Sequence, residues 1–412
     1  MVRISTVTKG DQVARPPGRP ARIAFRPVSL ASGDHDGTGT TPAGLGLASA
    51  RGVRVHVDPF TPSPVPRRFA HACWTSPHIE PGFAFDELVA TWHARTPGES
   101  WIEVSARARS VGSAGWSRWL VLARWADHDS ALHPTSVLDE SCDPRVSSDT
   151  ARVATDTLLA PGGADAWQLR VTLLRLEEGT VGNPELTYVG AMVSSPRELS
   201  NAPSVAGPAA GRALDVPALS QHIHAGHYPE WGGGGEVWCS PTSVAMMLAF
   251  WGTGPDSAAI SWVPCGYPDR PVYHAVRHCW DHAYRGAGNW SFNVAYAARF
   301  GLRSFVTRLR DLTEVEAFIA AGIPLVASLQ VNPADLAGAE YTSRGHLMVV
   351  TGFTATGDVV VNDPAAKDLA TLRRVYRRGE FERAWLAGSG GIVYIIHPPA
   401  ATLPQRPADP NW

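Results

Sequence analysis

The sequence lacks any apolar run that approaches the about 20 residues needed to cross a bilayer. It also lacks an excess of charge of either sign, since the formal net charge is −2. The first absence excludes a membrane-spanning protein. The second removes the electrostatic reason to expect nucleic acid or an anionic membrane as a partner. No internal repeat with a period of about 20 to 50 residues is found, so nothing indicates a repeat architecture.

A standard secretory signal is also absent, because residues 1–26 carry basic residues and prolines but no apolar core of about 7 to 15 residues. We therefore expect a cytoplasmic protein, with an extracellular one as the alternative. The cysteines are odd in number: Cys73, Cys142, Cys239, Cys265 and Cys279. If one is catalytic, the other four could pair or stay reduced. The missing signal favours reduced and buried thiols.

The length of 412 residues, with 44% hydrophobic and 18% charged residues, allows two or three globular domains. Residues 1–66 are rich in Gly, Pro, Ser, Thr and Arg and are predicted to be mostly unpacked. Residues 197–212 contain Pro203, Pro208 and several Ala and Gly, which predicts a linker. A second domain would then span residues 213–400, followed by a tail at 401–412.

Residues 67–196 hold short strand patterns at 101–109, 117–125, 167–176 and 186–193, separated by Gly, Pro and Asp clusters. In the first of them, Ile102, Val104 and Ala106 alternate with polar residues and are predicted to face inward. The polar residues predicted to face outward are Glu103, Arg107 and Arg109. Regularly spaced short strands without intervening helices predict an all-β sandwich.

The periodicity is mixed after residue 213. Helices are predicted at 242–251, 270–282, 291–300 and 312–321, and strands at 324–330, 346–351, 359–362 and 392–396. Helices followed by an antiparallel sheet predict an α+β domain.

Cys239 lies just before one of these helices. The helix is indicated by apolar residues at i, i+3, i+4 and i+7 spacing, which are Val244, Met247, Leu248 and Trp251. Pro241 suits the first helical position and Gly252 the residue just past the end. The thiol of Cys239 is thus predicted at a helix N-terminus, where the peptide dipoles lower a cysteine's pKa and favour the thiolate. Such a nucleophile is the first half of a cysteine hydrolase.

His346 and Asp363 could supply the second half. His346 starts an apolar strand pattern, and Asp363 follows another that ends at Pro364. Thr356-Gly357-Asp358 predicts a hairpin turn between them, so that pairing would bring His346 near Asp363. A nucleophile on a helix, with His and Asp on a following sheet, is the papain-like arrangement. Asn362 is a rival for the role of Asp363, but neighbours on a strand face opposite sides, so only one can serve.

Four segments between about residue 215 and residue 398 resemble the C39-like (papain-like) cysteine peptidase family, in a bacterial type with an N-terminal β-sandwich domain. The segments are Val216-Pro217 with Ser220-Gln221, then Trp238-Cys239-Ser240-Pro241-Thr242-Ser243, then Gly345-His346-Leu347, and then Asn362-Asp363-Pro364. The resemblance implies that Cys239 is the nucleophile, His346 the general base and acid, and Asp363 the group that orients the imidazole. It also implies that Gln221 donates into an oxyanion hole beside the Cys239 backbone N–H. The long loop between Gln221 and Cys239, with four consecutive glycines, departs from the family's pattern.

No cofactor or metal is expected. Two sets of histidines invite a metal hypothesis, namely His222, His224 and His227, and His274, His278 and His282. No cysteine or carboxylate pattern completes either set.

The sequence predicts a cysteine peptidase or amidohydrolase that acts on a peptide or protein substrate through a Cys239 acyl-enzyme. Acyl transfer is an alternative, since the same residues serve when an amine replaces water. A second alternative is an inert binding protein whose tryptophan-rich β-sandwich binds a ligand such as a glycan. Core packing explains Trp119 and Trp125 as well as ligand stacking does. The intact Cys, His and Asp favour the enzyme.

Overall fold

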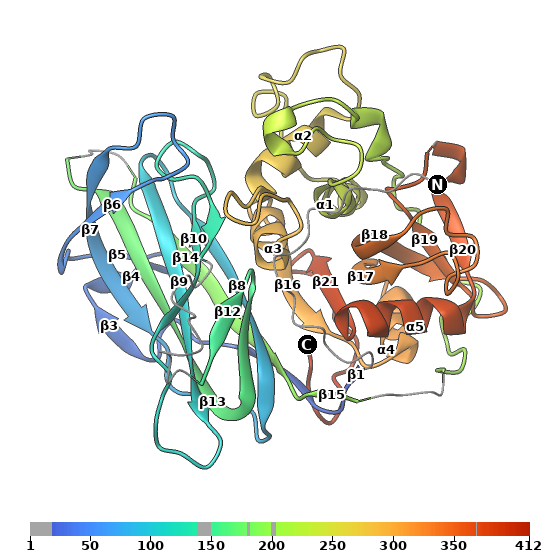
Figure 1. Cartoon of the computed structure of the whole chain (residues 1–412), viewed down its shortest axis with the longest axis horizontal. Coiled ribbons are helices and arrows are strands. Elements are labelled where there is room, and N and C mark those ends of the chain that lie inside the picture. Colours follow the sequence, from blue (N-terminus) through green and yellow to red (C-terminus); the bar gives the residue numbers. More distant parts are fainter. Residues whose placement is uncertain (1–18, 138–149, 179–181, 199–202, 368) are drawn as a thin grey trace. The chain divides into compact units, whose positions relative to one another are not determined.

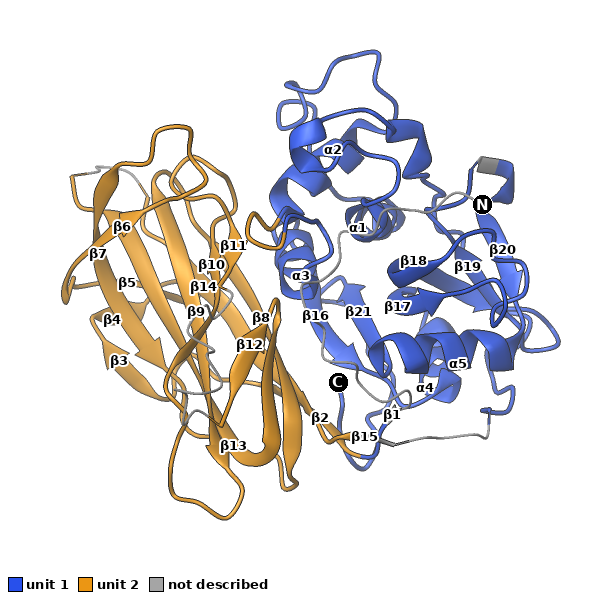
Figure 2. Ribbon diagram, in the orientation of Figure 1, with its two compact units in different colours: residues 1–21, 197–280, 285–412 blue, residues 22–196, 281–284 orange. Residues whose placement is uncertain are grey.

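The computed structural model describes residues 19–137, 150–178, 182–198, 203–367 and 369–412. It divides into two compact units, which Figure 2 shows in different colours. The N-terminal unit comprises residues 22–196 together with residues 281–284. The C-terminal unit comprises the remaining described residues, mainly 203–280 and 285–412. The chain therefore has an N-terminal mostly-β unit followed by a unit of helices and sheet.

Strands alone make up the described part of the N-terminal unit (Figure 1). They are β2 (Ile23–Pro27), β3 (Asp34–Asp36), β4 (Thr38–Thr40), β5 (Leu45–Leu47), β6 (Gly52–Val57), β7 (Pro66–Thr75), β8 (Phe85–Arg95), β9 (Ser100–Ser110), β10 (Leu120–Trp125), β11 (Thr135–Ser136), β12 (Arg152–Ala154), β13 (Thr157–Leu176) and β14 (Glu185–Ser194). Their pairings are antiparallel. The predicted strands at 101–109, 117–125, 167–176 and 186–193 correspond to β9, β10, β13 and β14.

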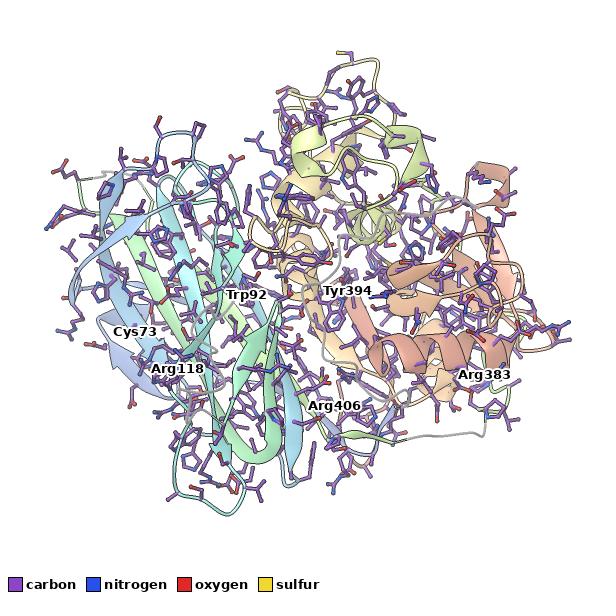
Figure 3. The ribbon with its side chains drawn as sticks, in the orientation of Figure 1. Cys73, Trp92, Arg118, Arg383, Tyr394 and Arg406 are labelled. Atoms are coloured by element: carbon purple, nitrogen blue, oxygen red, sulfur yellow. The ribbon has the colours of Figure 1, made fainter. Side chains whose placement is uncertain are left out.

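The long strand β13 joins two sets of strands. Its first part pairs with β8 and β12, and its second part pairs with β9 and β7. The register shifts before Ala164, next to Gly163, whose φ of +79° favours glycine. Fully buried tryptophans fill the unit: Trp74, Trp92 (labelled in Figure 3), Trp101, Trp125 and Trp167. Core packing thus accounts for five of the seven tryptophans of this region.

The prediction that residues 1–66 are mostly unpacked is wrong from Ile23 onward; residues 1–18 lie outside the described part of the chain. Strand β2 pairs with β14, and β6 pairs with β7. Ile23, Phe25 and Leu45 are buried in the core. The apolar residues of this segment are too few to show a period, and partners more than a hundred residues away in the sequence, such as those of β2, fix its strands.

Glu103 of β9 was predicted to face solvent, and this is wrong, because its exposed fraction is 8%. Arg54 Nη1 lies 2.7 Å from Glu103 Oε1, and Arg124 Nε lies 3.0 Å from Oε2. Arg124, from the neighbouring strand β10, and Arg54, from β6, cover the carboxylate. The inward residues of the same strand are as predicted, since Ile102 and Val104 are fully buried.

The C-terminal unit contains α1 (Cys239–Phe250), α2 (Arg270–Cys279), α3 (Trp290–Ala298), α4 (Leu312–Ala320) and α5 (Arg378–Ser389). Its strands are β1 (Arg19–Pro20), β15 (Arg197–Glu198), β16 (Arg303–Arg308), β17 (Leu325–Val331), β18 (Ser343–Phe353), β19 (Val359–Asn362), β20 (Arg373–Tyr376) and β21 (Ile392–His397). Short 3-10 turns are η1 (His222–His224), η2 (Pro229–Trp231) and η3 (Leu369–Thr371). All four predicted helices and all four predicted strands are present. None of the described helices is both long and apolar enough to span a membrane.

Six strands form an antiparallel sheet in the order β16-β21-β17-β18-β19-β20. Helix α1 contacts β18, and α5 contacts β17. Figure 1 shows α1 above and α5 below these strands. The sheet therefore has a helix on either side, and the N-terminus of α1 approaches β18.

Residues 203–211, predicted as a linker, are held against the C-terminal unit. Glu316 accepts hydrogen bonds from the backbone N–H groups of Gly207 and Ala209, at 2.9 and 3.1 Å. Arg378 Nη1 donates to the same carboxylate at 2.6 Å. The predicted tail is also packed, since Trp412 is buried and its ring meets that of Phe318 edge to face. Contacts with side chains distant in the sequence, which the composition does not reveal, hold both segments.

Three cysteines outside the Cys239 region are free thiols. Cys279 is buried and Cys73 is half-buried, whereas Cys265 is exposed. The expectation of buried thiols is therefore wrong for Cys265, which lies in the irregular segment between α1 and α2. Cys142 lies outside the described residues.

Candidate active site

Cys239 is the first residue of α1, and Trp238 is the N-cap. No side chain caps this helix, so its first-turn N–H groups are available to an anion. Pro241 is the third helical residue instead of the first, which costs no hydrogen bond because the first four N–H groups of a helix lack intrahelical partners. Gly252 follows the helix with a φ of +65°, as predicted. Ser243 Oγ, one turn after Cys239, donates to the carbonyl of Leu347 at 3.1 Å and holds this face of α1 against β18.

The hairpin of β18 and β19 explains how His346 and Asp363 meet. Gly357 closes the turn with a φ of +86°, and its N–H donates to Thr354 O. Val349 pairs with Asn362, so one further step places Asp363 opposite Met348, on the same face as His346. Asn362 faces the other way and donates to the backbone of Val216 at 2.9 Å. Asp363, and not Asn362, is therefore the partner of His346.

The structure brings the three predicted residues into one hydrogen-bonded chain. His346 Nε2 lies 2.8 Å from Asp363 Oδ1, and both side chains are buried. This contact leaves Nδ1 of the ring for Cys239, whose thiol is hydrogen-bonded to His346. The thiol also interacts with the backbone N–H groups of Leu347 and Ser240.

The electrostatics favour a charged Cys239–His346 pair. Burial raises the pKa of Cys239, but the hydrogen bond and positive charge of His346, with two backbone N–H groups, outweigh burial, so that this pKa lies below its ordinary value. Burial likewise lowers the pKa of His346, but the charge and hydrogen bond of Asp363, together with Cys239, raise it to about 10. Both shifts act in the direction of a thiolate beside an imidazolium.

Asp363 is itself supported by groups that the sequence did not indicate. Tyr341 donates to Asp363 Oδ2 at 2.9 Å, and Tyr376 donates to the same oxygen at 3.4 Å. Burial raises the pKa of Asp363, but His346, the Ala365 N–H and the Tyr341 hydroxyl outweigh burial and hold it below its ordinary value. The Tyr341 ring also packs edge to face on His346. No spacing in the sequence singles out either tyrosine.

Gln221 is buried, with an exposed fraction of 1%, and its Oε1 has no hydrogen-bond partner in the described part of the chain. Its backbone N–H donates to Pro364 O at 2.9 Å, next to Asp363. The turn that it begins, η1, reaches Trp238, because the rings of His224 and Trp238 are 5.7 Å apart. Gln221 therefore lies between the segments that carry Asp363 and Cys239.

The four glycines before Cys239 have a conformational role, and Gly234 also has a packing role. All four have positive φ values between 67° and 80°. A Cβ at Gly234 would lie 2.0 Å from the carbonyl oxygen of His224. The loop can therefore close over η1 only without a side chain at Gly234. The long loop between Gln221 and Cys239 departs from the family's pattern, but it still allows Gln221 an ordered position.

The histidines of the metal hypothesis contact aromatic residues. His224 packs on Trp238 and Tyr273, and burial lowers its pKa to about 4, helped by the charge of His227. His274 Nδ1 lies 2.8 Å from the Tyr296 hydroxyl. Among the described residues, no group of three or more His, Cys, Asp or Glu is arranged to hold a metal ion.

The chain matches two family models. Residues 24–194 match the peptidase C39 N-terminal domain, and residues 213–392 match the peptidase C39 like family. A search of curated proteins finds no match. The boundaries of the two matches follow the two units of the structure closely, and the second match spans Gln221, Cys239, His346 and Asp363. The chain belongs to the C39-like peptidase family, in the type that carries a C39 N-terminal domain.

Proposed function

We propose that the protein is a cysteine peptidase or amidase that uses Cys239, His346 and Asp363 as its catalytic triad. The observation that carries the proposal is the hydrogen-bonded chain from the Cys239 thiol through His346 to Asp363 at the N-terminus of α1. A catalytic thiol needs a base within hydrogen-bond reach and a group that orients the base. His346 and Asp363 would supply these two groups from buried side chains, beside the half-buried Cys239.

In the first step, the Cys239 thiolate attacks the carbonyl carbon of a peptide or amide bond. The oxyanion accepts hydrogen bonds from the Cys239 backbone N–H and the Gln221 side-chain amide. The His346 imidazolium then gives its proton to the leaving amine, and a thioester to Cys239 remains. Asp363 keeps the imidazolium oriented and stabilised throughout.

In the second step, neutral His346 takes a proton from water, and the resulting hydroxide attacks the thioester carbonyl. Collapse of this intermediate releases the carboxylic acid product and returns Cys239 as a thiolate, with His346 again protonated. The lowering of the Cys239 pKa makes the thiolate a better leaving group here. We also infer a papain-like fold for residues 213–400 and a β-sandwich for residues 22–196, because the nucleophile precedes an antiparallel sheet that carries His346 and Asp363, and because β13 joins two sets of strands.

Intact-mass spectrometry with an electrophilic peptide trap, such as a peptidyl vinyl sulfone, tests the proposal. We expect one adduct on the native chain and none on Cys239→Ala. Cys73, Cys142, Cys265 and Cys279 are the internal controls in the same molecule. Modification of Cys265 in preference to Cys239 would contradict the proposal, since Cys265 is exposed and has no histidine partner in the described residues.

A further inference from the structure

Exposed apolar side chains gather on β6 and on the loop that follows it. Among the large hydrophobic residues that are exposed in the described part of the chain, five of eight lie within residues 53–65: Val53, Val55, Val57, Phe60 and Val65. Val55 is the most exposed of the three on the strand, at 56%. A single exposed valine is ordinary, but a contiguous group of exposed apolar side chains marks an interaction surface.

β6 is also an edge strand. Among the described strands, it pairs with β7 alone (Figure 1). Arg68 of β7, opposite Val55, turns its carbonyl away from β6 and accepts from the N–H of Glu177 at 2.9 Å. The pair of Arg68 and Val55 is therefore not hydrogen-bonded, and backbone groups alternate along an antiparallel pair. The N–H and C=O groups of Val53, Val55 and Val57 thus point away from β7, to the free edge.

None of the three residues at this free edge would block the pairing of another strand. Val53, Val55 and Val57 carry both the exposed side chains and the outward backbone groups, because alternate residues of a strand share a face and a hydrogen-bonding direction. Proteins ordinarily protect such an edge with a charged side chain or a proline. The three outward positions of β6 hold neither. The edge is therefore open to a further strand.

The sequence of β6 suits pairing with a second copy of itself. Its valines stand symmetrically about Val55, with Val53 two residues before it and Val57 two residues after it. When two copies lie antiparallel around a two-fold axis at Val55, each Val53 therefore meets Val57 of the second copy, and the two Val55 residues meet each other. An interface with two-fold symmetry requires such reciprocal pairs. Cross-strand pairs of β-branched residues stabilise a sheet.

The opposite face of β6 also tolerates this pairing. There Arg54 would meet His56 of the second copy. The Arg54 guanidinium already pairs with Glu103 at 2.7 Å, and burial lowers the pKa of His56, so that its imidazole is neutral at pH 7. The His56 ring packs on Trp101, at a centroid distance of 5.0 Å. No like charges are therefore brought together across the two-fold axis.

We propose that two copies of this chain associate by antiparallel pairing of their β6 edges, with Val55 at the two-fold axis. The valine pairs each exchange both N–H···O=C bonds, which satisfies the backbone groups at the free edge. Their side chains cover one another on the exposed face. A contact of one strand is smaller than a standard protein interface, so the dimer is weak and depends on concentration. The pairing uses the N-terminal unit alone and is independent of the proposed catalysis.

Sedimentation velocity of the full chain from about 1 to 200 µM tests the association. We expect the native chain to shift from monomer to dimer over this range. Val55→Lys should weaken dimerisation at least about tenfold, because it places two like charges opposite each other. Val111→Lys is the matched control, since Val111 is 50% exposed in the same unit but outside β6, and it should dimerise as the native chain does. A native chain that stays monomeric, or equal effects of the two substitutions, would overturn the proposal.

Amide hydrogen exchange of the native chain, followed by NMR, needs no substitution. Protection of the N–H groups of Val53, Val55 and Val57 should rise with protein concentration. The N–H groups of Arg54 and His56 face β7 and should be protected at every concentration. Valine protection that does not depend on concentration would show that a segment of the same chain covers the edge. That result, or a lack of protection at the highest concentration, would refute the pairing of two copies.

Disulfide trapping tests the register, in a Cys265→Ser background because Cys265 is exposed. Val55→Cys should form a covalent dimer under mild oxidation, since a hydrogen-bonded antiparallel pair places its Cα atoms about 5.5 Å apart, within the range of a disulfide. Val53→Cys should not, because its two thiols would lie about 13 Å apart along the strands. Equal trapping at both positions would contradict a two-fold axis at Val55.

Discussion

Cys239 and His346 have pKa values shifted in opposite directions, which predicts the pH dependence of the thiol. The rate of alkylation by iodoacetamide should rise with pH through an apparent pKa well below the about 8.5 of a free thiol. Turnover should fall again as His346 loses its proton near pH 10. His346→Ala should move the alkylation midpoint up toward that of a free thiol. Intact-mass measurements across the pH range provide the test, and a midpoint indifferent to His346 would show that the pair is structural.

The same groups link stability to pH. The pKa of His346 is raised, so its contribution is complete below about pH 6.5 and is lost as pH rises toward 10. The pKa of Asp363 is lowered, so its contribution is present above its ordinary value of about 4 and is lost as pH falls further. We expect His346→Ala to flatten the alkaline side of a plot of melting temperature against pH. An unchanged alkaline side would contradict the assigned direction.

Tyr341 is predicted to act through Asp363 as a positioning residue. Tyr341→Phe keeps the ring on His346 but removes the 2.9 Å hydrogen bond to Asp363 Oδ2. A hydrogen bond to a buried charge contributes about 1.5 to 3 kcal/mol, so we expect kcat to fall about tenfold or more with little change in KM. Tyr376→Phe is the matched control, because its bond to the same oxygen is longer, at 3.4 Å, and should matter less. Equal effects of the two substitutions would contradict this ranking.

Gln221 can be separated from the triad by comparing two reactions of the same thiol. Gln221→Ala should lower kcat/KM about 10²- to 10³-fold, which is the usual effect of losing an oxyanion donor. Alkylation by iodoacetamide forms no oxyanion, so its rate should be unchanged. A parallel loss of turnover and alkylation would instead indicate that Gln221 only holds the fold around Cys239.

At the scale of elements, the packing of α5 on β17 depends on Gly388. A Cβ at this position would lie 2.3 Å from the backbone N of Gln330. We expect Gly388→Ala to lower the free energy of unfolding by about 1 to 3 kcal/mol, because this clash outweighs the gain of up to about 1 kcal/mol in helix propensity. Gly379→Ala in the same helix is the control, since its nearest contact is a flexible Arg383 side chain at 3.4 Å. Thermal unfolding should show a lower midpoint for the first variant and an unchanged or higher one for the second.

The elements that sequence analysis found in the C-terminal unit are those with a clear apolar period. It did not find β16, β20 or α5. Arg303 and Arg308 bound β16 and indicate a surface, yet Arg308 is fully buried and donates to the backbone of Ser389. Charged residues interrupt the apolar pattern of α5, so its buried face cannot be recognised from the sequence. One of them, Glu382, is buried and accepts hydrogen bonds from the backbone N–H groups of Leu312 and Ser204. Tertiary hydrogen bonds decide these positions, and a single sequence does not contain them.

The candidate site likewise contains residues that the sequence indicates and residues that it does not. Cys239, His346 and Asp363 each stand next to a local signal, namely a helix start, a strand start and a strand end. Tyr341 and Tyr376 are recognised only by their distance from Asp363. The proximity of His346 and Asp363 could therefore be predicted, and the two tyrosines that donate to Asp363 could not.

At the scale of the whole molecule, the two units contribute unequally to the proposed chemistry. The three residues of the proposed triad and Gln221 all belong to the C-terminal unit. The six-stranded sheet, the helices and the packed segment 203–211 all lie in this same compact unit. Residues 281–284 are the exception, because they group with the N-terminal unit, where the backbone of Ser136 donates to Asp281 at 2.9 Å.

Deletion of residues 1–200 is therefore predicted to leave a folded and thiol-reactive protein. The hydrogen bonds among Cys239, His346, Asp363 and Tyr341 join residues that all remain in the fragment. The segment at 281–284 loses the hydrogen bonds that it makes with residues 134–136, so we expect a lower melting temperature and new protease cleavage there, between α2 and α3. Circular dichroism, limited proteolysis and the alkylation pH profile of Cys239 provide the measurements. A fragment that folds but alkylates like a free thiol would show that the N-terminal unit is needed to form the thiolate pair, and an unfolded fragment would show that the two units fold as one.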